Sequence, residues 1–326
     1  MGGGRGPIGR GQRERLTPRE ARRHQLRLDR TAPPPRAAGA QYRERKRQQF
    51  RPWKMAGFPT YRGLRPELGA AVPAVTSSEE PNVPRASPLM FHRLAPYYDD
   101  LVGQKDYPSE VRTLESLARR WVRSGGRSWL DVACGTGRHL SFLRRHYTVR
   151  GVDLSPEMLR VAKRRLPGVR LGIGDMRSFR LGETFDVISC LYSAIGHLET
   201  ERDVRTTFEN FARHLTPGGI AIVEPWIDPV DFRSGFVHLL THSSPSVTVV
   251  RMAFSSRRGR RSAIHYHYLI GRSGRRVEHF EEVDRGLLVP RRRLVQLMRS
   301  AGLKAWFLTN GLPSGRGLLL GLKPHS

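Results

Sequence analysis

Cysteines, acidic residues and long apolar runs are all scarce in this sequence of 326 residues. Its two cysteines, Cys134 and Cys190, both lie in apolar segments, so they predict neither a disulfide framework nor a zinc site, and no metal is expected. No apolar run approaches the roughly 18 residues that span a bilayer. The N-terminus also lacks the apolar core of a secretory signal. We therefore expect a cytoplasmic protein with no membrane partner.

The charge balance is strongly basic. Lys and Arg number 57 against 29 Asp and Glu, which gives a formal net charge of +28. The excess is densest in residues 1–88, which are also rich in Gly, Pro and Gln and predict a disordered arm. A basic arm can attract nucleic acid. A general preference for arginine is the simpler explanation, so nucleic acid is not a favoured partner.

From residue 89 onward the pattern becomes that of an α/β domain. Up to Trp226, short apolar strands roughly 20–30 residues apart alternate with amphipathic helical segments. Three segments within about residues 229–288 then alternate at period two, which predicts an antiparallel meander, before a helix and two strands end the chain. We therefore predict a doubly wound, Rossmann-like sheet of seven strands, with the meander covering the strand ends where ligands bind.

A glycine turn, Asp131–Gly137 (DVACGTG), is the strongest motif and lies between a predicted strand and a predicted helix. Gly135 and Gly137 permit a tight turn that brings the backbone against a ligand. Asp153 ends the next strand, where its carboxylate can accept hydrogen bonds from two ribose hydroxyls. Taken singly, the turn could belong to a nucleotide dehydrogenase, and Asp153 could cap the following helix.

The end of the third strand favours one cofactor over the other. Asp175 can accept an adenine amino proton there, and the thioether of Met176 can lie on the ring, although Asp175 alone could be a turn former. A dehydrogenase fingerprint would have a third glycine where this chain has Leu140. The combined spacing matches class I methyltransferases and predicts S-adenosylmethionine as cofactor. The candidates to bind it are Asp131, Ala133, Gly135, Gly137, Asp153, Leu154, Asp175 and Met176.

The chain also resembles a narrower family. The glycine turn, GDMRSF, FDVISCLYSAIGHL, IVEPW, SAIHYHY and PSGRGLLLGL are similar to small-molecule N-methyltransferases, especially those that dimethylate nucleotide-linked deoxyamino sugars. The resemblance covers nearly all of residues 96–323 and implies methyl transfer to an amine of a small molecule. It further implies catalytic roles for His197 and Tyr98, cofactor contacts from Tyr107 and Leu191, and substrate contacts from Glu224, Trp226, His265 and Arg316.

Two other functions are compatible with the fold. An enzyme acting on RNA or protein could use the basic arm, but the fourth strand ends in Cys-Leu-Tyr-Ser, without the Asn/Asp-Pro-Pro-aromatic turn of many base-amino methyltransferases. A binding protein without activity would not need the intact set of glycines and acids. Simpler roles also exist for single residues: backbone could satisfy His197, and His265 and His267 could form a polar strand face. A homodimer is compatible with the sequence.

Overall fold

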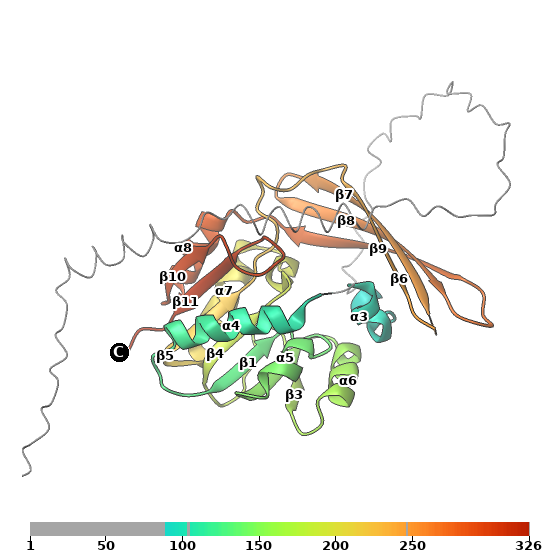
Figure 1. Ribbon diagram of the computed structural model, residues 1–326. Coiled ribbons are helices and arrows are strands. Elements are labelled where there is room, and N and C mark those ends of the chain that lie inside the picture. Colours follow the sequence, from blue (N-terminus) through green and yellow to red (C-terminus); the bar gives the residue numbers. More distant parts are fainter. Residues whose placement is uncertain (1–88, 103–104, 246, 326) are drawn as a thin grey trace, which may run out of the picture. The chain divides into compact units, whose positions relative to one another are not determined.

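The computed structural model describes residues 89–102, 105–245 and 247–325 (Figure 1). The predicted disordered arm, residues 1–88, lies outside the described residues. The described part of the chain contains two sheets, one of seven strands and one of four.

The larger sheet is the predicted doubly wound sheet, and its strand order is β10-β11-β5-β4-β1-β2-β3. Strands β1 to β5 run parallel, while β11 is antiparallel to both of its neighbours, β5 and β10. The strand order reverses between β1 and β4, which is the place where open α/β sheets bind ligands. The strands are β1 (Ser128–Val132), β2 (Thr148–Asp153), β3 (Arg170–Ile173), β4 (Phe185–Cys190), β5 (Leu215–Val223), β10 (Lys304–Leu308) and β11 (Leu318–Leu322).

Helices cover both faces of this sheet, because alternate residues of each buried strand point to opposite sides. In β5, Ile220 and Ile222 pack with α4 and α5, whereas Ala221 and Val223 pack with α7 and α8. The sheet is therefore buried on both faces, as a parallel sheet requires. The helices are α4 (Tyr107–Trp121), α5 (Arg138–Leu143), α6 (Pro156–Arg165), α7 (Glu201–His214) and α8 (Arg291–Ser300).

Side chains cap the N-termini of three of these helices. The Asp106 carboxylate accepts a hydrogen bond from the backbone N–H of Ser109 at 3.0 Å and begins α4. Ser155 caps α6, and Thr200 and Asp203 form a reciprocal capping box for α7. Each cap satisfies a backbone N–H that has no partner inside the helix.

The smaller sheet is the predicted meander with one strand more than expected. Its order is β6-β7-β8-β9, all antiparallel. Strand β6 was not predicted, because its adjacent Leu239 and Leu240 break the alternation of apolar and polar residues. The strands are β6 (Val237–Ser243), β7 (Thr248–Arg258), β8 (Arg261–Gly271) and β9 (Glu278–Leu287).

One face of the smaller sheet packs against the start of the described chain. This segment consists of η1 (Leu89–Phe91), η2 (Ala95–Tyr97) and α3 (Tyr98–Leu101). Met90 and Leu94 from it form a cluster with residues of β7 and β8, including Val249 and Tyr268. The opposite face, which we call the outer face, carries exposed apolar side chains of β6, β7 and β8: Val237, Leu239, Met252, Phe254 and Leu269.

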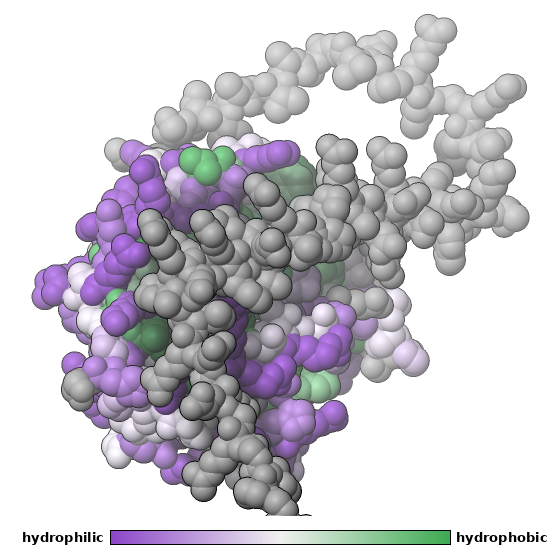
Figure 2. All heavy atoms as spheres, turned by 60° about the vertical axis from the view of Figure 1, so that its left-hand side comes forward, coloured by the Kyte–Doolittle hydropathy of each residue, from purple (hydrophilic) through white to green (hydrophobic). Residues whose placement is uncertain are grey.

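Hydrophilic residues predominate on the face of the molecule that Figure 2 shows, and the apolar residues in view form small separate groups. Among the described residues, no helix combines the length and the apolar character that crossing a membrane requires.

Candidate active site

The glycine turn between β1 and α5 has the left-handed backbone that its glycines permit, and Ala133 shares that conformation. Ala133, Gly135 and Gly137 have φ angles of 57°, 55° and 74°. A Cβ atom added to Gly137 would lie 2.6 Å from Cδ1 of Leu166 and would also be strained by the positive φ, so both packing and backbone favour glycine here. A Cβ atom added to Gly135 would meet nothing within 4 Å. Gly135 thus leaves open space beside the turn, where a ligand can approach the backbone.

Asp153 lies beside this turn at the end of β2. Its carboxylate accepts hydrogen bonds from the backbone N–H groups of Gly135 at 2.7 Å and Ser155 at 2.8 Å. Burial raises the pKa of Asp153, and these two hydrogen bonds oppose that rise. The next side chain, Leu154, is 60% exposed. A carboxylate and an exposed apolar side chain therefore share one sheet edge, which suits a sugar joined to a purine.

Asp175 and Met176 follow β3 at the same edge. The Asp175 carboxylate accepts a hydrogen bond from Nη2 of Arg177 at 2.6 Å, and this guanidinium lowers the pKa of Asp175. Arg177 also lies 3.5 Å from Asp203. Met176 is partly buried against the core beneath α7. Asp175 is thus ionised and already paired, so an adenine amino group would share this carboxylate with Arg177.

Asp131 and Leu191 are buried residues at the ends of β1 and β4. The Asp131 carboxylate is 2% exposed and accepts a hydrogen bond from Oγ of Ser189 at 2.6 Å, while Ser189 accepts one from Nε1 of Trp129. Burial raises the pKa of Asp131. Leu191 is 4% exposed and packs in the cluster beneath α4. Both residues form the floor of the site.

Asp99, which the sequence analysis did not select, fastens α3 to the glycine turn. Its carboxylate accepts hydrogen bonds from Oγ1 of Thr136 at 2.8 Å and from Nη2 of Arg165 at 2.5 Å. Arg138 at the start of α5 lies 3.8 Å away. The acidic pair in the YYDD segment could have indicated this contact. A carboxylate there can pair with Arg138, which directly follows the glycine turn.

Tyr98 lies near two other tyrosines, Tyr107 and Tyr192, and near Asp153. Lys105 Nζ lies 4.2 Å from the ring centroid of Tyr192 and 5.2 Å from that of Tyr107. Burial raises the pKa of both Tyr98 and Tyr107, and the neighbouring tyrosines and Asp99 raise it further. These hydroxyls therefore stay neutral, and the rings form an aromatic wall that Lys105 contacts together with Arg138, whose guanidinium carbon lies 5.0 Å from the Tyr107 ring centroid.

His197 lies on η3 (Ala194–His197) and faces a carboxylate from the other sheet. Its Nδ1 is 3.2 Å from Oδ1 of Asp284 on β9, and its ring makes an edge contact with Phe91 at 5.4 Å between centroids. Asp284 is only 9% exposed. Sequence reasoning missed Asp284, because nothing local links β9 to η3. A carboxylate at this distance from Nδ1 can orient the imidazole ring.

Trp226 connects η3 with the smaller sheet. A Cβ atom on Gly196 would lie 2.7 Å from Cβ of Trp226, and one on Gly286 would lie 2.6 Å from its Cε2. The indole Nε1 donates a hydrogen bond to Oγ of Ser262 at 3.0 Å. The ring centroids of Trp226 and His197 are 6.0 Å apart. The structure therefore brings these two predicted residues together and fixes the tryptophan.

Glu224 and Arg316, which were predicted separately as substrate contacts, lie next to each other in the structure. Glu224 is fully buried at the end of β5, accepts a hydrogen bond from the Tyr192 N–H at 2.6 Å and lies 3.4 Å from Nη1 of Arg316. Tyr192 and Ser193 have φ angles of 53° and 63°. Glu224 thus holds a strained turn after β4, of the kind that often marks functional sites.

His265 does not join this group. In β8, Tyr266 and Tyr268 point toward the segment that begins the described chain, so His265 points to the outer face. Its Nε2 lies 3.3 Å from Oγ of Ser256. Tyr266 takes the inward place, with Arg251 5.3 Å from its ring centroid. A period-two pattern predicts two faces but not which one is turned inward.

Comparison with known proteins agrees with this geometry. A model of the methyltransferase domain matches residues 130–219. The chain is 42% identical to dTDP-3-amino-3,6-dideoxy-alpha-D-glucopyranose N,N-dimethyltransferase of Streptomyces fradiae, over 68% of this chain and 88% of that enzyme. The crystal structure of Streptomyces venezuelae DesVI superposes with a TM-score of 0.65 at 36% identity, covering 69% of this chain and 94% of DesVI.

A third relative shows the cofactor. CalS10, an amino pentose methyltransferase from Micromonospora echinaspora solved with S-adenosylmethionine bound, is 34% identical with a TM-score of 0.62, over 67% of this chain and 92% of CalS10. Fold, site and relatives together define an S-adenosylmethionine-dependent methyltransferase. Within that class, the chain belongs to the family of sugar N-methyltransferases that contains the Streptomyces fradiae enzyme.

Proposed function

We propose that this enzyme methylates the amino group of a nucleotide-linked deoxyamino sugar. One observation carries the proposal: the similarity to the Streptomyces fradiae enzyme reaches 88% of that protein, far beyond the domain match at residues 130–219. It therefore includes segments outside the cofactor-binding sheet. A shared cofactor fold alone does not require such similarity.

The residues at the sheet edge fit S-adenosylmethionine. The backbone at Gly135 has open space beside it, and Asp153 and the exposed Leu154 suit the ribose and the purine. Tyr98 and Tyr107 would close over the methionine end. The cofactor supplies an already activated methyl group, so the protein must mainly align the acceptor amine with it. Alignment of two bound reactants can contribute about 7–11 kcal/mol to lowering a barrier.

His197 is the proposed proton acceptor. An amine attacks only in its neutral form, and a histidine nitrogen can take up the proton it loses. Asp284 beside Nδ1 would hold the ring and stabilise the imidazolium that forms. Trp226 would line the same side of the site, since it packs against the helical turn that carries His197.

Arg316 is the proposed contact to the substrate phosphates. Its guanidinium is 30% exposed and paired with the buried Glu224, so one side of the cation stays available. Planar guanidinium groups suit phosphate oxygens well. We also infer that the enzyme works in the cytoplasm, which is supported by its two free, buried cysteines, Cys134 and Cys190.

A direct assay tests the proposal. The full chain is incubated with S-adenosylmethionine and a dTDP-linked amino sugar, and in parallel with the same sugar bearing a hydroxyl in place of the amine, and with RNA. We expect the amino sugar alone to gain the mass of one or two methyl groups. Methylation of RNA without methylation of the amino sugar would overturn the proposal in favour of the nucleic-acid alternative.

A further inference from the structure

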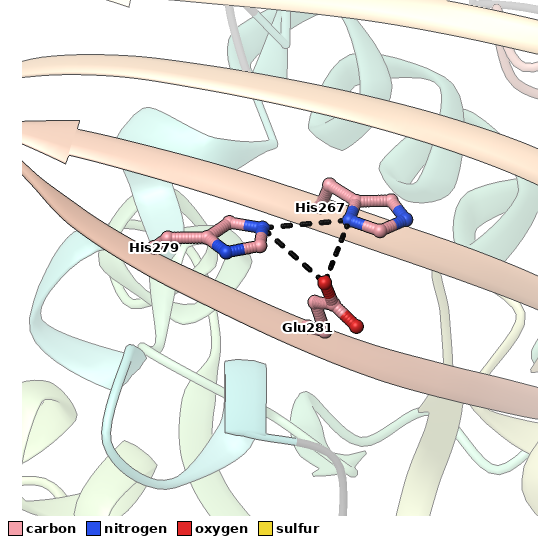
Figure 3. A group of neighbouring side chains, drawn as sticks. All are labelled: His267, His279 and Glu281. Carbon is pink, nitrogen blue, oxygen red and sulfur yellow. Dashed lines mark hydrogen bonds and ion pairs between the residues drawn. The ribbon is translucent and has the colours of Figure 1, made fainter.

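A cluster on the outer face of the smaller sheet lies on the opposite side of that sheet from Asp284. His267 lies on β8, and His279 and Glu281 lie on β9. The strands are paired so that His267 stands opposite Glu281, while His279 stands opposite Leu269. All three side chains therefore point to the same face and toward one another (Figure 3).

The three facing atoms form a nearly equilateral triangle. Nδ1 of His267 lies 3.4 Å from Nε2 of His279 and 3.3 Å from Oε1 of Glu281, and the last two atoms are 3.6 Å apart. A tetrahedral zinc ion with bonds of about 2.0–2.1 Å separates its ligand atoms by about 3.3–3.4 Å. The triangle thus matches three corners of such a tetrahedron without movement of the backbone.

From this geometry we propose that His267, His279 and Glu281 bind a divalent transition-metal ion, of which Zn²⁺ is the representative. Two imidazoles and one carboxylate are ligands that such ions accept, whereas Ca²⁺ and Mg²⁺ prefer oxygen alone. The three side chains are 51%, 49% and 64% exposed, so the fourth coordination position opens toward solvent. No metal was predicted from the sequence, in which the two cysteines do not indicate a zinc site. The three residues proposed here come from two strands, so no local spacing joins them.

The ion would fix the pairing of β8 with β9. On the same strand β9, Glu282 points to the other face, where it accepts hydrogen bonds from the Met90 N–H and the Tyr268 hydroxyl. Asp284, two residues further, faces His197. A crosslink at Glu281 therefore acts on the strand that positions Asp284, although it lies on the opposite face from the methyl-transfer site. Its role is structural.

Calorimetric titration of the untagged, chelator-treated full chain with ZnCl₂ tests the proposal. We expect one ion per chain in this site. Removing a residue that only hydrogen-bonds to a metal ligand weakens metal binding about 10- to 100-fold. H267A and H279A each remove a ligand itself, so each should weaken binding by at least about 100-fold. Glu281→Gln should also weaken it. All three positions are exposed, so far-UV circular dichroism should show unchanged folds.

H265A is the matched control, because His265 lies on the same strand and the same face outside the triangle. It should leave the zinc affinity unchanged, which shows that removal of a neighbouring histidine on this face does not by itself weaken binding. Co²⁺ should give the intense visible bands of a tetrahedral centre in the wild type and lose them in H279A. Equal zinc affinity in wild type and H279A, or no binding by the wild type, would overturn the proposal.

Discussion

At the scale of single residues, the pairing of His197 with Asp284 connects the chemistry to the fold. The imidazole of His197 makes an edge contact with the ring of Phe91 and lies near the indole of Trp226, and the Asp284 carboxylate lies 3.2 Å from its Nδ1. Each contact comes from a different part of the chain. A ring held in this way can present its second nitrogen in one orientation, as general base catalysis requires.

Replacing this ring should affect turnover and leave cofactor binding intact. We expect His197→Ala to lower kcat by about 10²–10⁴-fold, the usual contribution of a positioned general base. Steady-state kinetics and calorimetric titration with S-adenosylmethionine measure the two effects separately. Asp284→Asn, which keeps the shape of the side chain, should cause a smaller loss of kcat. A large loss of cofactor affinity in His197→Ala would show that the residue is structural instead.

Asp153 should behave in the opposite way. Its carboxylate is predicted to bond the ribose hydroxyls, and a hydrogen bond to a charged group contributes about 1.5–3 kcal/mol. We therefore expect Asp153→Ala to weaken S-adenosylmethionine binding about 10- to 100-fold in calorimetric titration. The residue also accepts the N–H groups of Gly135 and Ser155, so thermal unfolding must be measured alongside. Unchanged affinity in a folded variant would exclude the predicted role.

At the scale of elements, a buried ionic contact joins the start of α4 to α5. The Glu110 carboxylate lies 2.8 Å from Nε2 of His139 and 3.0 Å from Nζ of Lys105. Burial alone would raise the pKa of Glu110, but the hydrogen bonds from His139 and Lys105 outweigh it, and the pKa is lowered. The same helix end carries Tyr107, whose ring contacts His139 at 5.0 Å between centroids.

This contact predicts a pH dependence of stability. A carboxyl whose pKa is lower in the folded state stabilises the fold above its unfolded pKa, and the stabilisation is lost as the pH falls through the folded value. We expect the wild type to lose stability below about pH 4.5, the ordinary value for Glu. Glu110→Gln should lose less over the same range. Urea unfolding at several pH values measures both, and parallel curves would contradict the assignment.

At the scale of the whole molecule, the described residues contain both sheets and every predicted site residue. We therefore expect a chain of residues 89–326 alone to bind S-adenosylmethionine with the affinity of the full chain. Calorimetric titration of both chains provides the test. Retention on immobilised RNA over a salt gradient is the companion measurement, because phosphate contacts weaken steeply with salt. Strong retention that depends on residues 1–88 would favour the nucleic-acid alternative.

By itself the sequence determined the class of fold and the cofactor. The strand, glycine turn and helix around Asp131–Gly137 are contiguous. Asp153 ends one strand of the same parallel sheet and Asp175 follows the next. Periodicity reports such local features directly, because backbone sterics and burial act within a few residues. The edge strand β6 was not predicted, since adjacent Leu239 and Leu240 break the alternation of apolar and polar residues in its sequence.

Only the tertiary structure decided which distant residues meet. His197 on η3 meets Asp284 on β9, and Asp99 hydrogen-bonds to Thr136 in the glycine turn. His265 points away from the site, while Tyr266 on the same strand faces inward. A shift of strand register by one residue exchanges the two faces of a strand, and the packing of the first described segment under β7 and β8 chooses between them. That choice rests on contacts between segments far apart in the chain.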